Sequence, residues 1–255
     1  MLLRSSMVTT SQISQSYTTR LDSIILKLEK ETQEHWEEIR ELGGWTAVVR
    51  KEDYITLQEI DKWCKENLGH TIRSLYYPGS SCNLTPLFAL KDCTEFNYQD
   101  TEKIISAIVP GFNAIIPEYI KEATLQPSDN KNYAELSFMA DKTLDKKETN
   151  FQKGIINILQ NSNVEEEIMS QIKKVDIIFG NNSLVTEDMI ANAKEGCIIH
   201  DTTGIGSDNF RISDHPELIQ RYGLVKIELP LTEIKGHDKW GLYIKGPIPK
   251  KPLSF

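Results

Sequence analysis

The feature that most constrains the fold is a pair of short apolar runs in the last third of the chain. Residues 175–179 and 197–200 each have the length and the β-branched content of a buried strand. Between them, residues 184–194 have a helical pattern, with acidic residues near the start and Gly196 after the end. A strand, a helix and a second strand in this order predict two parallel strands covered by a helix.

The rest of the chain extends this alternation. We expect further strands at 71–77, 94–99 and 133–140, and a closing pair of strands at 224–229 and 241–245. We expect helices at 16–42, 53–67, 184–194 and 216–222, and helical material over 101–123; residues 141–174 are ambiguous apart from a helical pattern at 164–174. The closing pair has no helix between its strands, which predicts an antiparallel terminal strand at the sheet edge. The sequence therefore predicts an α/β three-layer sandwich with a mostly parallel sheet.

The organisation along the chain predicts an N-terminal tail with a helical leader at 1–69 and an α/β domain at 70–255. The leader has three interpretations at this point: a cap over a pocket, a partner-binding surface, or packing against the edge of the sheet. Packing is the commonest use of an amphipathic helix.

Composition excludes several classes of protein. No stretch approaches the roughly 18 apolar residues of a membrane-spanning helix, and residues 1–16 lack the apolar run of a signal peptide. The four cysteines form no CxxC pair, so we expect neither a zinc site nor a disulfide framework, and a reduced, cytoplasmic location is the simplest interpretation. A net charge of -8 disfavours nucleic acid as a partner.

Two segments carry a family resemblance. The first predicted strand runs into the turn Tyr77-Pro-Gly-Ser80, and Asn83-Leu-Thr-Pro86 follows, where Asn83 or Thr85 can cap a helix. The second segment, from Val175 to Asp201, contains D-I-I-F and A-K-E-G-C-I-I-H-D. In this order, followed by the closing strand pair, residues 70–246 resemble the class I S-adenosylmethionine (SAM)-dependent methyltransferases, which have a Rossmann-like fold.

The resemblance implies a cofactor, a reaction and a set of site residues. It implies SAM as cofactor and methyl transfer to an unidentified small-molecule or protein substrate. It implies a cofactor turn at Tyr77, Pro78, Gly79, Ser80 and Ser81, with Asp100 accepting hydrogen bonds from the ribose hydroxyls and Asp141 on the adenine side. It places the substrate near Asn181, Asn182, His200 and Asp201. No general base is required, because the sulfonium carries its own leaving group.

Three alternatives stay open. The turn has a single glycine, Gly79, and Tyr76 and Tyr77 stand where the family often has an acid. A methyltransferase-like protein that has lost SAM and binds a partner is therefore one alternative, and a protein that binds another adenosine-containing ligand is the second. In the third, His200 is a hydrogen-bonded structural residue and not a base. The acids and histidines of residues 200–215 also permit a metal site, although a helix cap before Pro216 explains part of them.

Overall fold

The computed structural model describes residues 50–79, 83, 85–100, 120–127, 133–140, 154–160, 165–180, 185–201, 212–229 and 241–248, with residues 30, 34 and 37. For residues 100, 120–127, 133–140, 154–160, 165 and 167 the description covers the backbone alone.

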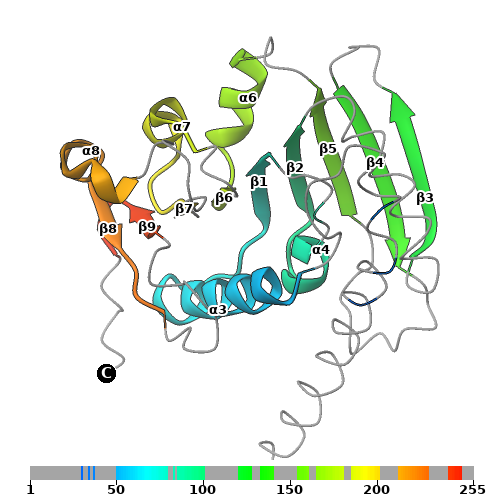
Figure 1. Cartoon of the computed structure of the whole chain (residues 1–255), viewed down its shortest axis with the longest axis horizontal. Helices are drawn as coiled ribbons and strands as arrows, with labels where there is room; N and C mark the ends of the chain where they lie inside the picture. The colour runs from blue at the N-terminus through cyan, green and yellow to red at the C-terminus, as the bar shows by residue number, and fades with distance from the viewer. Residues whose placement is uncertain are drawn as a thin grey trace, which may run out of the picture.

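One nine-stranded sheet forms the centre of the molecule (Figure 1). Its strands are β1 (Ser74–Pro78), β2 (Glu95–Asp100), β3 (Ile120–Pro127), β4 (Tyr133–Ala140), β5 (Gly154–Gln160), β6 (Ile177–Gly180), β7 (Ile198–Asp201), β8 (Leu224–Lys226) and β9 (Gly241–Lys245). Their order across the sheet is β3-β4-β5-β2-β1-β6-β7-β9-β8. The five central strands, β5, β2, β1, β6 and β7, are parallel. The mostly parallel α/β sheet predicted from the sequence is therefore confirmed.

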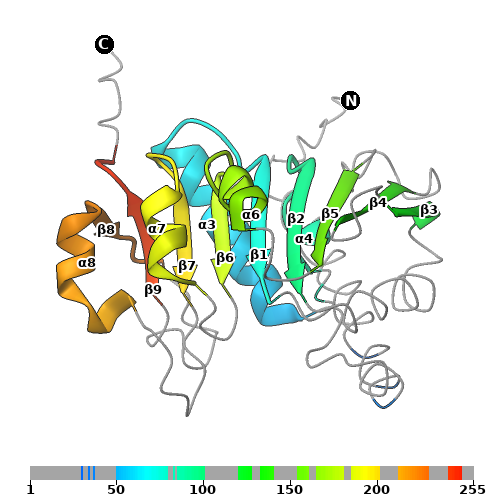
Figure 2. The same cartoon turned by 90° about the horizontal axis from the view of Figure 1, so that it is seen from above.

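Helices cover both faces of this sheet. They are α3 (Lys51–Asn67), α4 (Thr85–Ala89), α6 (Glu165–Ile172), α7 (Glu187–Asn192) and α8 (Pro216–Arg221). Helices α3 and α4 lie on one face, and α6 and α7 lie on the other (Figures 1 and 2). This is the three-layer arrangement of a Rossmann-like fold.

The alternation of side chains along each central strand divides the core into two parts. On β1, Leu75 and Tyr77 belong to the cluster under α3, whereas Tyr76 belongs to the cluster under α6 and α7. On β6, Ile177 and Ile178 divide in the same way. Strands that are buried on both faces explain why these segments are nearly continuous apolar runs in the sequence.

Helix α3 packs against a face of the sheet. Its buried side chains Tyr54, Leu57, Ile60 and Cys64 share one cluster with strands β1, β2 and β6. The helix ends where Gly69 adopts a left-handed conformation, with φ of 80°. Among the three interpretations, packing is therefore the one observed for residues 51–67, but on a face of the sheet and not against its edge. Of the expected helix at 16–42, the structure describes only Lys30, Glu34 and Glu37, which are helical.

The closing strand pair is antiparallel, as predicted, but β9 lies between β7 and β8 rather than at the edge. One prediction for the middle of the chain is wrong: residues 120–123, at the end of the expected helical material, belong to strand β3. The region left ambiguous contains strand β5. Strand β4 was expected, yet it pairs antiparallel with β3 and β5. Segment 120–127 contains good helix formers, so pairing with β4 has overridden its local propensity.

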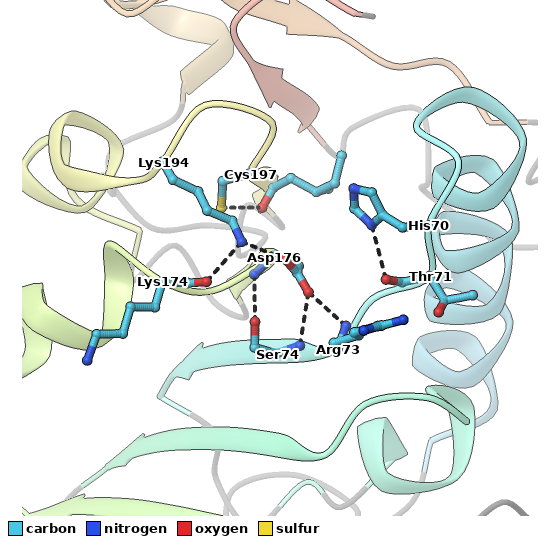
Figure 3. Close-up of polar contacts among 9 residues, drawn as sticks. His70, Thr71, Arg73, Ser74, Lys174, Asp176, Lys194 and Cys197 are labelled. Atoms are coloured by element: carbon cyan, nitrogen blue, oxygen red, sulfur yellow. Dashed lines mark hydrogen bonds and ion pairs between the residues drawn. The ribbon is translucent and has the colours of Figure 1, made fainter. Parts of the chain in front are cut away.

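The two central strands β1 and β6 are joined at their amino ends by Asp176 (Figure 3). Its carboxylate accepts hydrogen bonds from the backbone N–H groups of Arg73 and Ser74, at 2.8 and 3.2 Å. Lys194 donates to the same carboxylate at 2.6 Å and to the carbonyl oxygen of Lys174 at 2.9 Å. This cluster lies at the amino ends of the parallel strands, which we call the amino edge. It links the start of β1 to the segment that leads into β6.

In the part of the chain that the structure describes, no helix is both long enough and apolar enough to cross a bilayer.

Candidate functional site

The sheet has one topological switch point, between β1 and β6. From β1 the chain proceeds to β2 and β5 on one side, and then returns to β6 and β7 on the other. In open α/β sheets, ligands bind in the crevice beyond the carboxyl ends of the strands at such a point. We call this side of the five parallel strands the carboxyl edge. It is formed by the ends of β1, β2, β5, β6 and β7.

Strand β1 ends in a tight turn at Gly79. Its φ of 63° is left-handed, a conformation that a residue with a Cβ adopts only at a cost. The Gly79 N–H donates to the carbonyl oxygen of Gln99 at 2.8 Å, so the turn is held against β2. Because Pro78 pairs with Gln99, the backbone of Asp100 is the next along β2 and lies beside Gly79. Ser80 and Ser81 are outside the described residues.

Asn83 is completely buried and follows this turn. Its Nδ2 donates to the carboxylate of Asp53 at 2.6 Å and to the hydroxyl oxygen of Tyr77 at 2.9 Å. Its Oδ1 accepts from the backbone N–H of Thr85 at 3.0 Å, which caps the start of α4 as the sequence indicated. The Asn83 side chain therefore joins strand β1, helix α4 and helix α3.

Asp53 extends this polar group into helix α3. It is 6% exposed, and Arg50 Nη1 lies 3.8 Å from its Oδ2. Burial raises the pKa of the Asp53 carboxyl, and the attraction of Arg50 and the hydrogen bond from Asn83 oppose that rise. Arg50 also donates its backbone N–H to the Thr85 hydroxyl at 2.9 Å. Sequence reasoning missed Asp53, because it lies 30 positions from Asn83 and carries no motif.

A row of aromatic rings crosses four strands just inside the carboxyl edge. Tyr98, Tyr77, Phe179 and His200 come from β2, β1, β6 and β7 in that order. Tyr77 makes edge-to-face contacts with Tyr98 at 5.5 Å and with Phe179 at 5.2 Å between ring centroids. Tyr77 and Pro78 are buried, so of the predicted cofactor turn only Gly79 is partly exposed among the described residues.

His200 ends this row as part of the core. Its ring is 2% exposed and stacks on Phe179, with centroids 4.6 Å apart and planes at 6°. Burial lowers its pKa to about 3, against a backbone hydrogen bond with Gly180 that raises it. A neutral, stacked and buried ring corresponds to the structural alternative for His200, and not to a general base that meets substrate.

Asp201 faces the other side of the sheet, because neighbouring residues on a strand alternate. It is 2% exposed, and its Oδ2 accepts from the backbone N–H of Ile212 at 3.0 Å, within the cluster under α7. His200 and Asp201 therefore do not form an acid–base pair.

Strand β6 ends at Gly180, directly across the switch point from β1. A Cβ at Gly180 would lie 2.8 Å from the backbone oxygen of His200 and would also meet the side chain of Val185. The glycine is thus needed for β6, β7 and the start of α7 to pack. Asn181 and Asn182, the predicted substrate contacts, follow in sequence and are outside the described residues.

The structure does not support Asp141 as a residue on the adenine side of the cofactor. Asp141 itself is outside the described residues, and it follows strand β4, which is antiparallel to β5. Ala140 at the end of β4 therefore lies towards the amino edge, on the opposite side from Gly79 and Asp100. We leave Asp141 out of the site.

Metal and thiol chemistry find no support in the described ranges. No group of three or more His, Cys, Asp or Glu side chains there is arranged to hold a metal ion. Cys64, Cys93 and Cys197 are unpaired and buried. Burial raises the pKa of the Cys64 and Cys197 thiols to about 12 and that of Cys93 well above its ordinary value, which makes all three poor nucleophiles.

Comparisons with known proteins give little beyond this geometry. No family model matches the sequence, and no curated protein matches it. A solved structure from Methanococcus maripaludis, assigned as an S-adenosyl-L-methionine-dependent methyltransferase, is similar over 78% of this chain and 88% of its own, with 10% identity and a TM-score of 0.34. An O-methyltransferase family protein from Burkholderia thailandensis is similar over 90% of this chain and 73% of its own, with 8% identity and a TM-score of 0.37. Similarity at this level does not establish a shared fold.

Proposed function

We propose that the carboxyl edge binds SAM and that the protein is a SAM-dependent methyltransferase acting on a small molecule or a protein. The observation that supports the proposal is the switch point, where the left-handed Gly79 ends β1 and the backbone of Asp100 lies beside it. A glycine turn lets a ligand approach the backbone, and a carboxylate next to it suits the hydroxyls of a ribose.

The roles of the residues follow from their places at this edge. Gly79, Ser80 and Ser81 would surround the cofactor, and Asp100 would accept hydrogen bonds from its ribose hydroxyls. Asn181 and Asn182, which follow β6 on the other side of the switch point, would orient the substrate. SAM, when bound, supplies an electrophilic methyl group. The protein's contribution is then to position the acceptor and exclude water, so His200 and Asp201 are not needed as bases.

Calorimetric titration with SAM and S-adenosylhomocysteine, with NAD and ATP as controls, tests the proposal. Saturable binding of the first two alone is the expected result. Asp100→Ala should weaken that binding about tenfold or more, since hydrogen bonds to a charged group are worth about 1.5–3 kcal/mol. Asp92→Ala is the matched control: it removes the same charge from an exposed turn at the amino end of β2. Equal affinities for both variants would remove Asp100 from the site.

One observation favours a second function, a methyltransferase-like binding protein that has lost SAM. Tyr77 stands near the position where the family often has an acid, and its hydroxyl accepts a hydrogen bond from the buried Asn83. The final residues of β1 therefore present no acidic side chain to a ligand. Absence of binding by all four adenosine-containing compounds would favour this function, and binding of NAD or ATP alone would favour another adenosine-containing ligand.

A further inference from the structure

We propose that Asp53 and Asn83 are positioning residues for the candidate cofactor site: Asp53, on helix α3, sets the orientation of the Asn83 amide, and Asn83 ties Tyr77, near the end of β1, to Thr85, at the start of α4. The statement about ligand affinity rests on the proposed function. The statement about the Asn83 amide does not.

The partners of Asn83 determine which way its amide points. An ionised carboxylate only accepts hydrogen bonds, so the side of the amide that faces Asp53 at 2.6 Å must be the NH₂ group. The oxygen then faces the backbone N–H of Thr85, which only donates, at 3.0 Å. A reversed amide would place oxygen against oxygen at Asp53 and nitrogen against N–H at Thr85. Asp53 thus fixes the cap of α4 through Asn83.

Hydrogen bonds hold the two described residues on either side of residues 80–82, Gly79 and Asn83. At one end, Gly79 donates its N–H to Gln99 on β2 at 2.8 Å. At the other end, Asn83 is held by Asp53 and by Tyr77, its neighbour across the turn. Gly79 and Asn83 flank Ser80 and Ser81 in the sequence, the two further residues proposed to surround the cofactor. On one flank, the side chain of Asn83 is held by a carboxylate of α3, a helix that contributes no residue to the site itself.

The start of α3 is tied to the same point by its backbone. Arg50 donates its N–H to the hydroxyl of Thr85 at 2.9 Å, and its guanidinium lies 3.8 Å from the Asp53 carboxylate. The first turn of α3 and the first turn of α4 are thus joined directly by the bond from Arg50 to Thr85, and indirectly through Asp53 and Asn83.

Helix α3 provides a matched control. Asp61 lies two turns after Asp53, and its Oδ1 accepts from the backbone N–H of Ile72 at 2.7 Å. Like Asp53, it has a pKa raised mainly by burial. It supports the chain that enters β1 at the amino edge, away from Asn83. Asp61→Ala therefore removes the same kind of side chain and the same kind of bond without touching the positioning group.

The experiment compares Asp53→Ala, Asp53→Asn and Asp61→Ala by hydrogen–deuterium exchange of a peptide spanning 79–85, without ligand. We expect faster exchange in Asp53→Ala only, because the Thr85 amide loses its fixed acceptor. Asp53→Asn keeps a carbonyl oxygen for Asn83 and should restore slow exchange. If Asp53→Ala does not fold, Tyr77→Phe takes its place, since it removes one bond from the same amide at nearly constant volume. Exchange equal to the parent, or equally raised in Asp61→Ala, would overturn the proposal.

Titration with SAM and S-adenosylhomocysteine on the same variants tests the link to the ligand. We expect Asp53→Ala to weaken binding about tenfold and the other two variants to match the parent. If the parent binds neither compound but the exchange pattern holds, the proposed function fails while the positioning role stands. If the parent binds and Asp53→Ala binds equally well, the positioning role for the ligand is wrong while the proposed function stands.

Discussion

Tyr77 and Tyr98 allow the contributions of two buried hydroxyl groups to the free energy of unfolding to be compared. They are paired across β1 and β2, both are completely buried, and their rings touch edge to face. Their hydroxyl groups differ. That of Tyr77 accepts a hydrogen bond from Asn83, whereas that of Tyr98 has no hydrogen-bond partner among the described residues. Replacement by Phe removes a single oxygen atom at either position, so the change in packing is nearly the same.

We expect the two substitutions to change stability in opposite directions. Tyr98→Phe removes a buried polar group that has lost its water, and should raise the free energy of unfolding by about 1–2 kcal/mol. Tyr77→Phe removes a hydrogen bond and leaves one N–H of the buried Asn83 without its acceptor, which should cost about 1–3 kcal/mol. The two variants should then differ by about 2–5 kcal/mol, the sum of these two ranges.

Urea unfolding followed by circular dichroism measures the difference. Equal m-values in the parent and both variants are the control, because they show that the variants unfold from the same compact state. For a chain of this size each kcal/mol also moves the melting temperature by about 2–4 °C. The reasoning is refuted if Tyr98→Phe is destabilised as much as Tyr77→Phe, since a common loss would mean that packing, and not hydrogen bonding, decides both.

Three further predictions concern the edges of the sheet. Gly180→Ala should lower the free energy of unfolding by about 1–3 kcal/mol or more, because its Cβ would meet the backbone oxygen of His200, which cannot rotate away; a melting temperature unchanged from the parent's would contradict this. Gly79→Val should cost about 1–2 kcal/mol for the left-handed φ alone, and should also weaken SAM binding; Gly79→Asn, which tolerates that conformation, should lose less in both measurements, and equal losses would refute the conformational argument. Asp176 should contribute to acid sensitivity: partial burial would raise its pKa, but hydrogen bonds from Lys194 and from two backbone N–H groups outweigh burial and lower it. The contribution of Asp176 to the free energy of unfolding is therefore complete above the unfolded pKa of about 3.9 and is lost as pH falls through the lower folded pKa. Asp176→Asn should thus be less stable than the parent at neutral pH and should lose less stability on acidification. Parallel curves of stability against pH would contradict this.

The sequence predicted those parts of the fold in which local signals agree. Strands β6 and β7 are apolar runs buried on both faces, and Gly196 ends the intervening segment with a left-handed φ of 80°. Helix α7 starts at Thr186, whose hydroxyl accepts from the backbone N–H of Met189 at 3.3 Å. Hydrophobic pattern and end signals coincide there, and the elements were found in the right order.

Prediction from the sequence failed for strands whose arrangement depends on pairing with other strands. Strands β3 and β4 form a seven-pair antiparallel ladder, and β4 then pairs with β5. Segment 120–127 carries Lys, Glu, Ala, Leu and Gln, which read as helix when taken alone. Nothing local in 133–140 indicates the direction of this strand, so the sequence could not show which edge of the sheet its end reaches.

The sequence predicted which strand ends form the candidate site, but not the directions or contacts of the side chains there. Strand ends correctly placed Gly79 and Asp100 at one edge, because the carboxyl ends of parallel strands meet there. The facing of His200 and Asp201 depends on register, and a shift of one residue exchanges the two faces of a strand. Asn83 was recognised only as a helix cap. Its hydrogen bond to Asp53 joins residues 30 positions apart, and no local sequence pattern at either residue indicates it.

The single glycine of the turn and the buried polar group beside it are two parts of one arrangement. A turn with several glycines can adopt unusual backbone angles throughout, whereas this turn has one residue, Gly79, free to do so. After the turn, Asn83 is the next described residue, and its side chain makes three hydrogen bonds. Burying Asp53 and Asn83 costs desolvation that a pair of apolar residues would avoid. The hydrogen bonds of Asn83 to Asp53, Tyr77 and Thr85 offset this cost, so removing any one partner should destabilise the junction of β1, α3 and α4.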